Sequence, residues 1–472
     1  MAAPVAHVEI VDHWIEGKAS PGSGTRTADV YNPATGITQK RVRLATAADV
    51  DVAVQAAAEA FQGWANSSLA RRAQVMFAFR EQLNARKTEL AAIITSEQGK
   101  VLADAIGEVT RGLETVEFAC GMPNLLKGSM SENVSTGITV HSLRQPLGVT
   151  GIVSPFNFPA MVPLWFIPIA IAAGNTVVLK PSEKVPTAAV WIARLMQEAG
   201  LPEGVLNVVH GDKEAVDALL EHPDVASISF VGSTPTAKYV YETGAAHGKR
   251  VQALGGAKNH MLVLPDADLD LVADSAVGAG FGAAGERCMA ISVIVAVESI
   301  ADELVTKITD RIVALRTGDG MTGCDMGPLI TAQHLRRVVR YLDIAAEDGI
   351  EIVVDGRIGQ GNGAFQGDER GFFLMPTLLD NVTTNSRVYT DEIFDPVLSV
   401  VRVAGYADGI DLINSSAYGN GAAIFTNDGG AARRFEHEVQ AGMVGINVPI
   451  PVPVSYYSFG GWKASLFGDS NA

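Results

Sequence analysis

The sequence predicts an α/β protein built on parallel sheets, and two features of the chain indicate this fold. From residue 147 onward, short apolar runs alternate with stretches of helical periodicity, and each run ends in Gly, Ser or Pro. Such alternation is typical of a parallel sheet with crossover helices. A second α/β set follows Lys258, so we expect a domain change near Gly255–Gly256. The apolar runs of the first set are GVTGIVS, NTVVLKPS, GVLNVVHG and VASISFVGS.

Helices are predicted ahead of and between these strands. Thr46 and Asp49 form a capping box before an amphipathic helix. A longer helix is expected over residues 69–98, with Gly99 placed to end it. The longest apolar run, residues 160–173, is too short to span a bilayer and contains prolines, so it predicts a buried helix.

Charge and composition narrow the range of partners. The chain has 52 acidic and 36 basic side chains, and its formal net charge of -16 produces a field that repels phosphate. We therefore expect neither nucleic acid nor a membrane as a partner. The N-terminus carries acids and no apolar core segment, which argues against a secretory signal or an Arg-rich transit peptide.

Cysteine usage indicates a reducing compartment, for which we expect the cytoplasm, and histidine spacing bears on metal sites. Three cysteines lie far apart and form neither a disulfide framework nor a CxxC metal site. Nine scattered histidines show no HExxH spacing, so no metal site is predicted.

Cys288 is the candidate nucleophile. It lies in the small-residue stretch GAAGERCMAIS, which gives a substrate room to reach the sulfur, and a thiolate attacks a carbonyl carbon. The adjacent Arg287 can lower the pKa of the thiol and offers a guanidinium fork to a substrate carboxylate. Taken alone, a cysteine followed by Met289 and Ala290 also fits a buried core thiol, so other motifs have to decide between the two.

Two strand ends indicate a nucleotide site. The strand SISFV runs into Gly232 and Ser233, where a helix N-terminus would face a diphosphate; a plain strand-to-helix turn is the alternative. The strand NTVVLK leads to Lys180 and Glu183, at the edge where ligands bind in open α/β sheets. A carboxylate at Glu183 can accept hydrogen bonds from both ribose hydroxyls and would repel a 2′-phosphate, which favours NAD over NADP.

Two loop residues are further candidates. Asn157 lies in PFNFP, where prolines and aromatics hold it rigidly and its amide can donate to an oxyanion. The alternative is a structural turn residue. Glu392 lies in EIFDP beside an aromatic side chain and fits either a ligand of the nicotinamide ribose or a solvated loop acid.

The chain resembles the aldehyde dehydrogenase superfamily over nearly its whole length. Five motifs carry the resemblance and occur in the superfamily's order and rough spacing: PFNFP, KPSE, FVGS, GERC and EIFDP. Other stretches resemble the CoA-acylating methylmalonate-semialdehyde dehydrogenases: RGLETVEFACGMPNLLKG, VPLWFIPIAIAAGNTVVLKPSE, GAKNH and RCMA. The resemblance implies an aldehyde dehydrogenase-like fold, with a doubly wound NAD domain, an α/β catalytic domain and a small β oligomerisation arm.

The resemblance also implies roles for individual residues. Cys288 is then the nucleophile and Asn157 the oxyanion donor, while Arg111 and Arg287 grip the carboxylate of the substrate. Without the resemblance, Arg111 fits a surface charge on a helix. The residues implied to contact NAD are Ser154, Phe156, Lys180, Glu183, Lys184, Ser233 and Glu392.

Domain boundaries and assembly follow from the same resemblance. Residues 1–126 and 148–254 are expected to form the NAD-binding domain, residues 255–454 the catalytic domain, and residues 127–147 with 455–472 the oligomerisation arm. Superfamily members continue beyond the segment that matches FGGWKASLFGD with a further strand, whereas this sequence stops at Ala472. We expect a homo-oligomer, a dimer or tetramer, with a sheet edge left exposed at that point.

Three positions depart from the superfamily pattern. Ala253 stands where hydrolytic members have a glutamate base, and a methyl group cannot activate water, whereas a thiol acceptor ionises more readily. This departure favours thiolysis by CoA over hydrolysis. Glu286 replaces a glutamine and is expected to raise the pKa of the Cys288 thiol. Ala237 replaces a glycine on the phosphate-facing helix and is expected to hold the diphosphate slightly farther out.

We therefore expect NAD-dependent, CoA-acylating oxidation with decarboxylation of methylmalonate semialdehyde or malonate semialdehyde, giving propionyl-CoA or acetyl-CoA through a thioester on Cys288. Two alternatives stay open. A hydrolytic NAD-dependent semialdehyde dehydrogenase is disfavoured by Ala253, and a non-catalytic member of the same fold is disfavoured by Cys288 and Asn157. The sequence leaves open which semialdehyde and which pathway are physiological.

Overall fold

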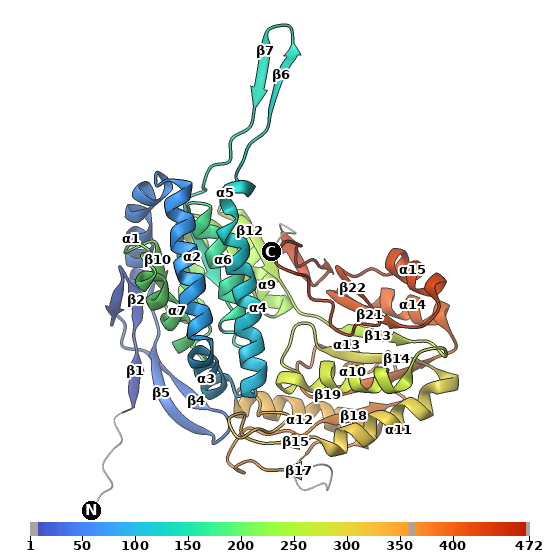
Figure 1. The fold of residues 1–472 in the computed structure, drawn as a ribbon. Coiled ribbons are helices and arrows are strands. Elements are labelled where there is room, and N and C mark those ends of the chain that lie inside the picture. Colours follow the sequence, from blue (N-terminus) through green and yellow to red (C-terminus); the bar gives the residue numbers. More distant parts are fainter. Residues whose placement is uncertain (1–7, 358–363, 469–472) are drawn as a thin grey trace, which may run out of the picture.

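The computed structural model describes residues 8–357 and 364–468. Two α/β lobes lie side by side, and a two-stranded hairpin projects from the first of them (Figure 1). An eight-stranded sheet forms the centre of the first lobe, and a seven-stranded sheet forms the centre of the second. The predicted α/β class is confirmed.

The sheet of the first lobe is parallel at its centre. Its strand order is β24-β12-β11-β8-β9-β10-β2-β3, and the five strands from β12 to β10 run parallel to one another. Every residue of β8 and β9 is buried, which explains why these strands read as continuous apolar runs rather than as alternating patterns. The parallel strands are β8 (Val149–Val153), β9 (Thr176–Lys180), β10 (Leu206–Val208), β11 (Val225–Val231) and β12 (Arg250–Leu254). Antiparallel pairs flank them: β2 (His13–Ile15) pairs with β10 and with the edge strand β3 (Lys18–Ser20), and the other edge strand, β24 (Leu466–Gly468), pairs with β12.

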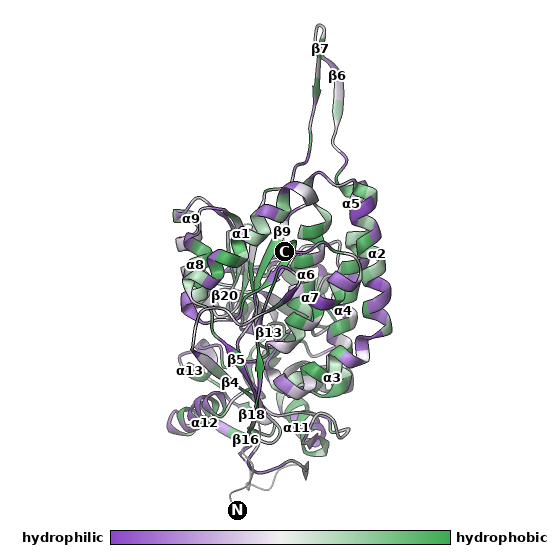
Figure 2. Cartoon of the chain, turned by 90° about the vertical axis from the view of Figure 1, so that its left-hand side faces the viewer, coloured by the Kyte–Doolittle hydropathy of each residue, from purple (hydrophilic) through white to green (hydrophobic). Residues whose placement is uncertain are grey.

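Helices cover both faces of this sheet and bury a separate apolar core on each side. In Figure 2, the middle of β9 is hydrophobic, whereas α2 carries hydrophilic residues on its outer side. The helices of one face are α1 (Ala47–Ala65), α8 (Lys213–Glu221) and α9 (Thr234–Ala246). The helices of the other face are α2 (Leu69–Ala85), α3 (Lys87–Gln98), α4 (Leu102–Cys120), α6 (Met161–Ala172) and α7 (Thr187–Glu198).

Two helix predictions are confirmed and one is wrong. The capping box of Thr46 and Asp49 begins α1, and the apolar run of residues 160–173 forms the buried helix α6. Residues 69–98, predicted as one helix, form α2 and α3 with a break at Arg86. The backbone of Arg86 leaves the helical region (φ −111°, ψ 14°), and its guanidinium pairs with Glu89 on α3 and with a glutamate of α7. One local ion pair and one ion pair to α7 accompany this bend, which helical periodicity alone does not reveal.

The second lobe contains a seven-stranded sheet in the order β16-β18-β19-β14-β13-β21-β22, in which only β16 runs antiparallel to its neighbour. The chain enters this lobe between β12 and β13, at residues 255–258. The strands are β13 (Asn259–Val263), β14 (Ile291–Val297), β16 (Glu351–Val354), β18 (Thr377–Asp380), β19 (Val397–Val403), β21 (Gly421–Phe425) and β22 (Met443–Ile446). The helices are α10 (Leu269–Phe281), η1 (Gly282–Gly285), α11 (Glu298–Ala314), α12 (Ala332–Glu347), α13 (Arg387–Thr390), α14 (Tyr406–Ser415) and α15 (Gly429–Glu438).

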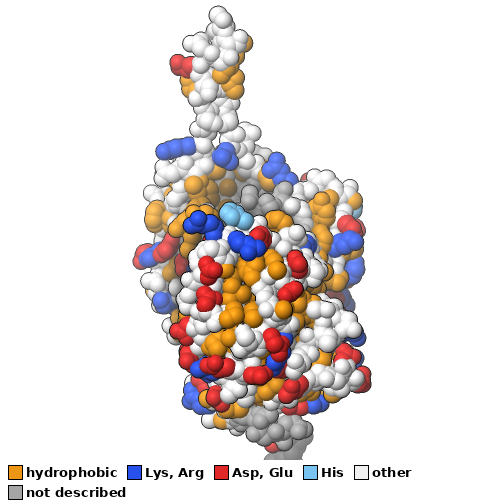
Figure 3. All heavy atoms as spheres, turned by 90° about the vertical axis from the view of Figure 1, so that its right-hand side faces the viewer, with side chains coloured by type: hydrophobic (Ala, Val, Ile, Leu, Met, Phe, Trp, Pro, Cys, Tyr) orange, Lys and Arg blue, Asp and Glu red, His pale blue; other side chains and the backbone are white. Residues whose placement is uncertain are grey.

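The projecting hairpin consists of β6 (Met130–Ser135) and β7 (Ile138–His141), and all residues of both strands are exposed. Figure 3 shows hydrophobic side chains along it. Residues 466–468, which we expected in the same arm, instead form β24 and pair with β12. This pairing satisfies backbone groups along the edge of the first sheet, which explains why the segment lies there. Residues 469–472 lie outside the described residues.

The remaining elements are β1 (Glu9–Val11), β4 (Thr27–Asn32), β5 (Ile37–Arg43), α5 (Met122–Leu125), β15 (Arg316–Thr317), β17 (Ala364–Phe365), β20 (Tyr418–Gly419) and β23 (Trp462–Lys463). Within residues 8–357 and 364–468, no helix combines the length and the apolar character needed to cross a bilayer.

Candidate active site

A deep cleft opens at the C-terminal ends of the five parallel strands of the first lobe. From β8 the chain continues to β9 and β10 on one side, whereas β11 and β12 lie on the other side, so the strand order reverses between β8 and β11. Ligands of open α/β sheets bind at such a reversal. The empty volume of the cleft is about 1870 Å³, its open mouth included.

The cleft brings together site residues predicted from separate motifs. Cys288 and Glu392 reach it from the second lobe, and the others follow the strands of the first lobe. The predicted residues that line it are Ser154, Phe156, Asn157, Lys180, Glu183, Lys184, Ser233, Cys288 and Glu392.

A left-handed turn delivers Cys288 to the cleft. Ala283, Ala284 and Gly285 have φ angles of 49°, 53° and 71°. Non-glycine residues adopt this region at a cost, so the surrounding contacts have to hold the turn. The Asp104 carboxylate accepts a hydrogen bond of 2.9 Å from the Ala283 N–H. At Gly285, a Cβ atom would collide with the backbone carbonyl of Asp395, so this position requires glycine for space as well as for φ.

The environment of Cys288 favours the protonated thiol. Burial and, to a smaller extent, the nearby Glu392 carboxylate together raise the pKa of Cys288 to about 12. The backbone N–H groups of Cys288 and Met289 and the Arg287 guanidinium act in the opposite direction. The Cys288 carbonyl accepts hydrogen bonds from the side-chain amides of Asn259 (2.9 Å) and Asn420 (3.0 Å), which fix the backbone of the nucleophile.

Glu286 does not act on the thiol in the way that the sequence suggested. Its fully buried carboxyl group accepts hydrogen bonds from the Gln98 side chain at 2.8 Å and from the Ile330 N–H at 3.1 Å. Burial raises the pKa of Glu286 to about 8, so the group is mostly neutral at pH 7. The acid that raises the pKa of Cys288 is Glu392 instead.

Asn157 is buried and held from two sides. Its side-chain Nδ2 donates to the Glu286 carbonyl at 3.0 Å, and its own carbonyl accepts from the Lys100 Nζ at 2.6 Å. Lys100 also forms a buried ion pair of 2.6 Å with Glu108 on α4. This pair was not predicted from the sequence. The available signal was Glu108, a charged residue beside Ala105 and Val109 on a helix face that is otherwise apolar.

The residues predicted to hold the nucleotide lie along the first-lobe side of the cleft. Lys180 Nζ lies 3.8 Å from a Glu183 carboxylate oxygen, and Lys184 Nζ lies 5.0 Å from the centre of the Phe156 ring. Burial lowers the pKa of Lys180. The Ser154 hydroxyl is buried and has no hydrogen-bond partner among residues 8–357 and 364–468.

Ser233 is the N-cap residue of α9 and is exposed at the edge of the cleft. Ala237, one turn later, is fully buried and packs in the core beneath α9. Its methyl group therefore packs in the core and does not line the cleft, so the expected outward displacement of a diphosphate stays a prediction that no contact in the cleft supports.

Glu392 lies in the loop between α13 and β19, and its carboxylate accepts a hydrogen bond of 2.9 Å from the Ala257 N–H. Arg337 on α12 donates to the Ile393 carbonyl and so supports the loop. Two aromatic contacts close this side of the cleft: the Phe156 ring lies edge-on to Phe394 and to His334, with centroids 6.1 and 6.2 Å apart. Arg337, His334 and Phe394 line the cleft and were not predicted from the sequence.

A second cavity reaches Cys288 from the opposite side, between α4, α6 and the segment that precedes β23. Its empty volume is about 1040 Å³, and both Arg111 and Arg287 line it. The fold therefore brings together two arginines that lie far apart in the sequence. Each has an acidic neighbour in this structure: Arg111 pairs with Glu114 at 2.7 Å, and Arg287 pairs with Asp104 at 3.0 Å. Phe158, Met161, Trp165 and Phe459 provide apolar surface.

Ala253 lies in β12, fully buried between Phe230 of β11 and Phe467 of β24 in the sheet register. The adjacent Leu254 belongs to a small apolar cluster against which Cys288 packs. At this point the chain therefore presents aliphatic groups and no carboxylate.

A model of the aldehyde dehydrogenase family matches residues 20–472 of the chain. A malonate-semialdehyde dehydrogenase from Pseudomonas aeruginosa is 53% identical over 462 residues, which are 98% of this chain and 92% of that protein. Malonate-semialdehyde dehydrogenase 1 from Geobacillus thermodenitrificans is 47% identical, over 98% of this chain and 95% of the relative.

Two solved structures share the fold closely. One, from Sinorhizobium meliloti, is assigned as a methylmalonate-semialdehyde dehydrogenase and was solved with NAD. It is 48% identical, has a TM-score of 0.96 and matches 99% of this chain and 94% of its own. The other is a methylmalonate-semialdehyde dehydrogenase from Oceanimonas doudoroffii, with 52% identity, a TM-score of 0.95 and coverage of 98% and 94%.

Proposed function

The chain belongs to the aldehyde dehydrogenase family, and on that premise we propose that it oxidises malonate semialdehyde or methylmalonate semialdehyde with NAD and CoA. The products are acetyl-CoA or propionyl-CoA and carbon dioxide. The observation that carries the proposal is the position of Cys288, which lines both the cleft of the first lobe and the arginine-lined cavity. A thiol between two cavities can meet an aldehyde on one side and a hydride acceptor on the other.

The cleft suits NAD on three grounds. The buried hydroxyl of Ser154 has no hydrogen-bond partner within the described chain and is therefore available to a ligand. Glu183 offers a carboxylate to ribose hydroxyls beside the Lys180 cation. The N-terminus of α9 at Ser233 presents backbone N–H groups that favour a phosphate. When bound there, NAD supplies the acceptor for the hydride.

The reaction begins when the thiol of Cys288 loses its proton to solvent. The N–H groups of Cys288 and Met289 and the Arg287 guanidinium stabilise the charge of the resulting thiolate. The sulfur bonds to the aldehyde carbon, and the carbonyl electron pair becomes an oxyanion. One proton of the Asn157 amide is held by the Glu286 carbonyl at 3.0 Å, which orients the amide and leaves its second proton for the oxyanion. The oxyanion then re-forms a carbonyl as a hydride leaves the carbon, and a thioester remains on Cys288.

The acyl group of this thioester carries a carboxylate on the carbon next to the thioester carbonyl. Carbon dioxide leaves when the bond between the carboxylate and this carbon breaks. The thioester carbonyl accepts the electron pair of that bond, and the resulting enolate then takes up a proton. The CoA thiolate attacks the acyl carbon and releases the Cys288 thiolate. Ala253 supports this order, since a buried methyl group offers no base to activate water.

The two arginines explain the preference for a carboxylated aldehyde. A guanidinium holds a carboxylate through two parallel hydrogen bonds, and Arg111 and Arg287 lie at the cavity that leads to Cys288. Their acidic neighbours Glu114 and Asp104 keep both guanidiniums oriented before the substrate arrives.

The test is NADH formation from malonate semialdehyde and from methylmalonate semialdehyde, with and without CoA. Without CoA we expect a single-turnover burst, because the thioester on Cys288 lacks an acceptor. With CoA we expect steady turnover and acyl-CoA of the decarboxylated acid, detected by mass spectrometry. Equal steady rates in both conditions would support the hydrolytic alternative and overturn the CoA assignment.

We also propose that the protein assembles with further copies of itself through the hairpin of β6 and β7. An isolated two-stranded hairpin is marginally stable in water, and this one exposes apolar side chains at Met130, Val134, Ile138 and Val140. Sedimentation analysis of the wild type and of an Ile138→Asp/Val140→Asp variant tests this; an unchanged mass would contradict it.

The cytoplasm is the proposed compartment, in keeping with three free cysteines.

A further inference from the structure

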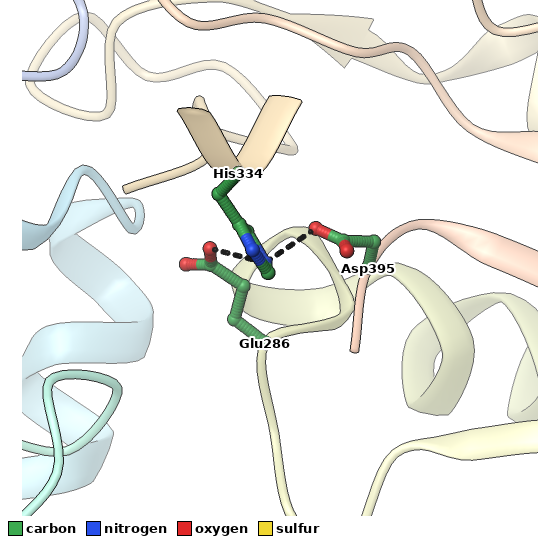
Figure 4. A group of neighbouring side chains, drawn as sticks. All are labelled: Glu286, His334 and Asp395. Atoms are coloured by element: carbon green, nitrogen blue, oxygen red, sulfur yellow. Dashed lines mark ion pairs between the residues drawn. The ribbon is translucent and has the colours of Figure 1, made fainter. Parts of the chain in front are cut away.

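A buried cluster of Glu286, His334 and Asp395 lies next to the nucleophile (Figure 4). Its members come from three segments that are distant in the sequence: the loop before Cys288, the first turn of α12 and the loop before β19. One potential metal-ligating atom from each residue lies within 4.8 Å of the other two. Because these residues are so far apart along the chain, no sequence motif indicates the cluster.

The cluster combines two acidic side chains with one imidazole, and neither a lysine nor an arginine is among its members. Both oxygens of the Asp395 carboxylate are buried and accept no hydrogen bond from any part of the chain that the structure describes. The Asp395 and Glu286 side chains are 0% exposed, and both carboxyl groups face the His334 imidazole, whose Nε2 lies 3.1 Å from Asp395 and 3.6 Å from Glu286. Both groups can be ionised together in this buried space only where a cation joins them.

Two of the three separations match a small divalent cation, and the third, between the two carboxyl groups, is at most 4.8 Å. Zinc binds imidazole nitrogen and carboxylate oxygen at about 2.0–2.2 Å in a tetrahedron, which places neighbouring ligand atoms about 3.3 Å apart. The distances of 3.1 and 3.6 Å from His334 Nε2 lie on either side of that value. His334 also lines the cleft, and its side chain is 14% exposed, so an ion has a path inward and a fourth position toward water.

We propose that Glu286, His334 and Asp395 bind one divalent transition-metal ion, zinc by ligand type and spacing, in the buried space next to the cleft that His334 lines. The ion joins the loop that carries Cys288 to the loop that carries Glu392 and to α12. It replaces the hydrogen bond of 3.3 Å that His334 Nε2 makes to the Phe394 carbonyl. The site is separate from the aldehyde chemistry, in which none of the three side chains takes part.

The test uses full-length protein with Cys288→Ser, so that the reactive thiol does not bind the metal. After treatment with EDTA and removal of the chelator, zinc is titrated by calorimetry. We expect one ion per chain, and at least about a tenfold loss of affinity in each of His334→Gln, Glu286→Gln and Asp395→Asn. The matched control is His222→Gln, which alters a histidine paired with Asp51 at 3.0 Å outside the cluster and should leave zinc affinity unchanged.

Cobalt provides a second measurement that does not depend on the cluster variants folding. Bound Co²⁺ in the Cys288→Ser protein should give the intense visible absorption of a tetrahedral site, displaced by one equivalent of zinc. If zinc does not bind stoichiometrically, or if the three cluster variants that fold bind it as tightly as their parent, the proposal is overturned, and the cluster holds shared protons rather than a metal.

Discussion

The Lys100 ammonium donates a hydrogen bond of 2.6 Å to the backbone carbonyl of Asn157 and so fixes the proposed oxyanion donor from behind. The same ammonium is paired with Glu108 and lies 4.1 Å from the centre of the Phe158 ring. A fully buried lysine thus connects α4 to the loop that carries Asn157.

We predict that Lys100→Met lowers kcat at least about tenfold while KM for NAD changes little, because the Asn157 loop loses its support. The variant should also lose roughly 3–5 kcal/mol of stability, since Glu108 keeps a buried charge without its partner. Lys40→Met is the control: Lys40 pairs with the buried Glu97 at 3.0 Å, away from the cleft, so it should lose stability but keep kcat. Equal effects of both variants on kcat would show that Lys100 has no positioning role.

Cys288→Ala should abolish NADH formation but retain NAD binding, because in the proposed mechanism the thiol takes part in the chemistry while Lys180, Glu183 and Ser233 hold the nucleotide. Cys120→Ala and Cys324→Ala should retain turnover, since both thiols are buried outside the cleft. Steady-state rates and NAD titration by fluorescence measure the two properties. Turnover of Cys288→Ala above about a few per cent of wild type would remove Cys288 from its role.

The reactivity of Cys288 should depend steeply on pH in the absence of ligands. Its pKa is raised to about 12, so the thiol is protonated at neutral pH and the thiolate fraction grows as pH rises. Alkylation by iodoacetamide, in EDTA, should therefore accelerate about tenfold per pH unit between about pH 7 and 10. A plateau below about pH 9 would show that the pKa is not raised.

Glu392→Gln should shift that alkylation profile to lower pH. The substitution removes the negative charge that adds to the effect of burial on the pKa of Cys288, so the thiolate forms more readily and alkylation is faster at each pH. Glu436→Gln, an exposed change on α15, is the matched control and should follow the wild-type profile.

Arg111→Lys and Arg287→Lys should each lower kcat/KM for methylmalonate semialdehyde by at least about tenfold, on the order of 1.4 kcal/mol. Lysine carries the charge but not the fork that a carboxylate fits. The kcat/KM for propanal, which has no carboxylate, should fall much less. Arg80→Lys is the control: it alters a surface pair with Glu117 and should leave kcat/KM unchanged for both substrates. An equal fall of kcat/KM for both substrates would mean that the arginines have a structural role only.

Gly285→Ala should lower stability by about 1–3 kcal/mol and reduce kcat, because Gly285 has a φ of 71° and a Cβ there collides with the Asp395 carbonyl. Gly278→Ala is the matched control. Gly278 lies inside α10 with open space where the Cβ of an alanine would lie, so alanine there should be neutral or add about 0.5–1 kcal/mol. Thermal unfolding with activity assays on the same samples distinguishes the two.

The sequence by itself determined the α/β class, the capping box of α1 and the motifs that line the cleft. Each of these depends on residues that are close together in the chain: hydrophobic periodicity, turn residues and a strand end followed by a polar side chain. Local pattern did not join residues as distant as Ser154 and Glu392 into one site; the superfamily resemblance implied that assignment.

Only the tertiary structure decided what depends on burial and on contacts between distant segments. Glu286 looked like a charge acting on Cys288, but the fold turns it toward Gln98 and Ile330 and keeps it mostly neutral. The pairing of β24 with β12, the support of Asn157 by Lys100 and the meeting of Glu286 with His334 and Asp395 likewise join segments far apart in sequence. Local pattern carries no information on such contacts, because the low-dielectric surroundings that set the charge of a side chain exist only once the two lobes have packed.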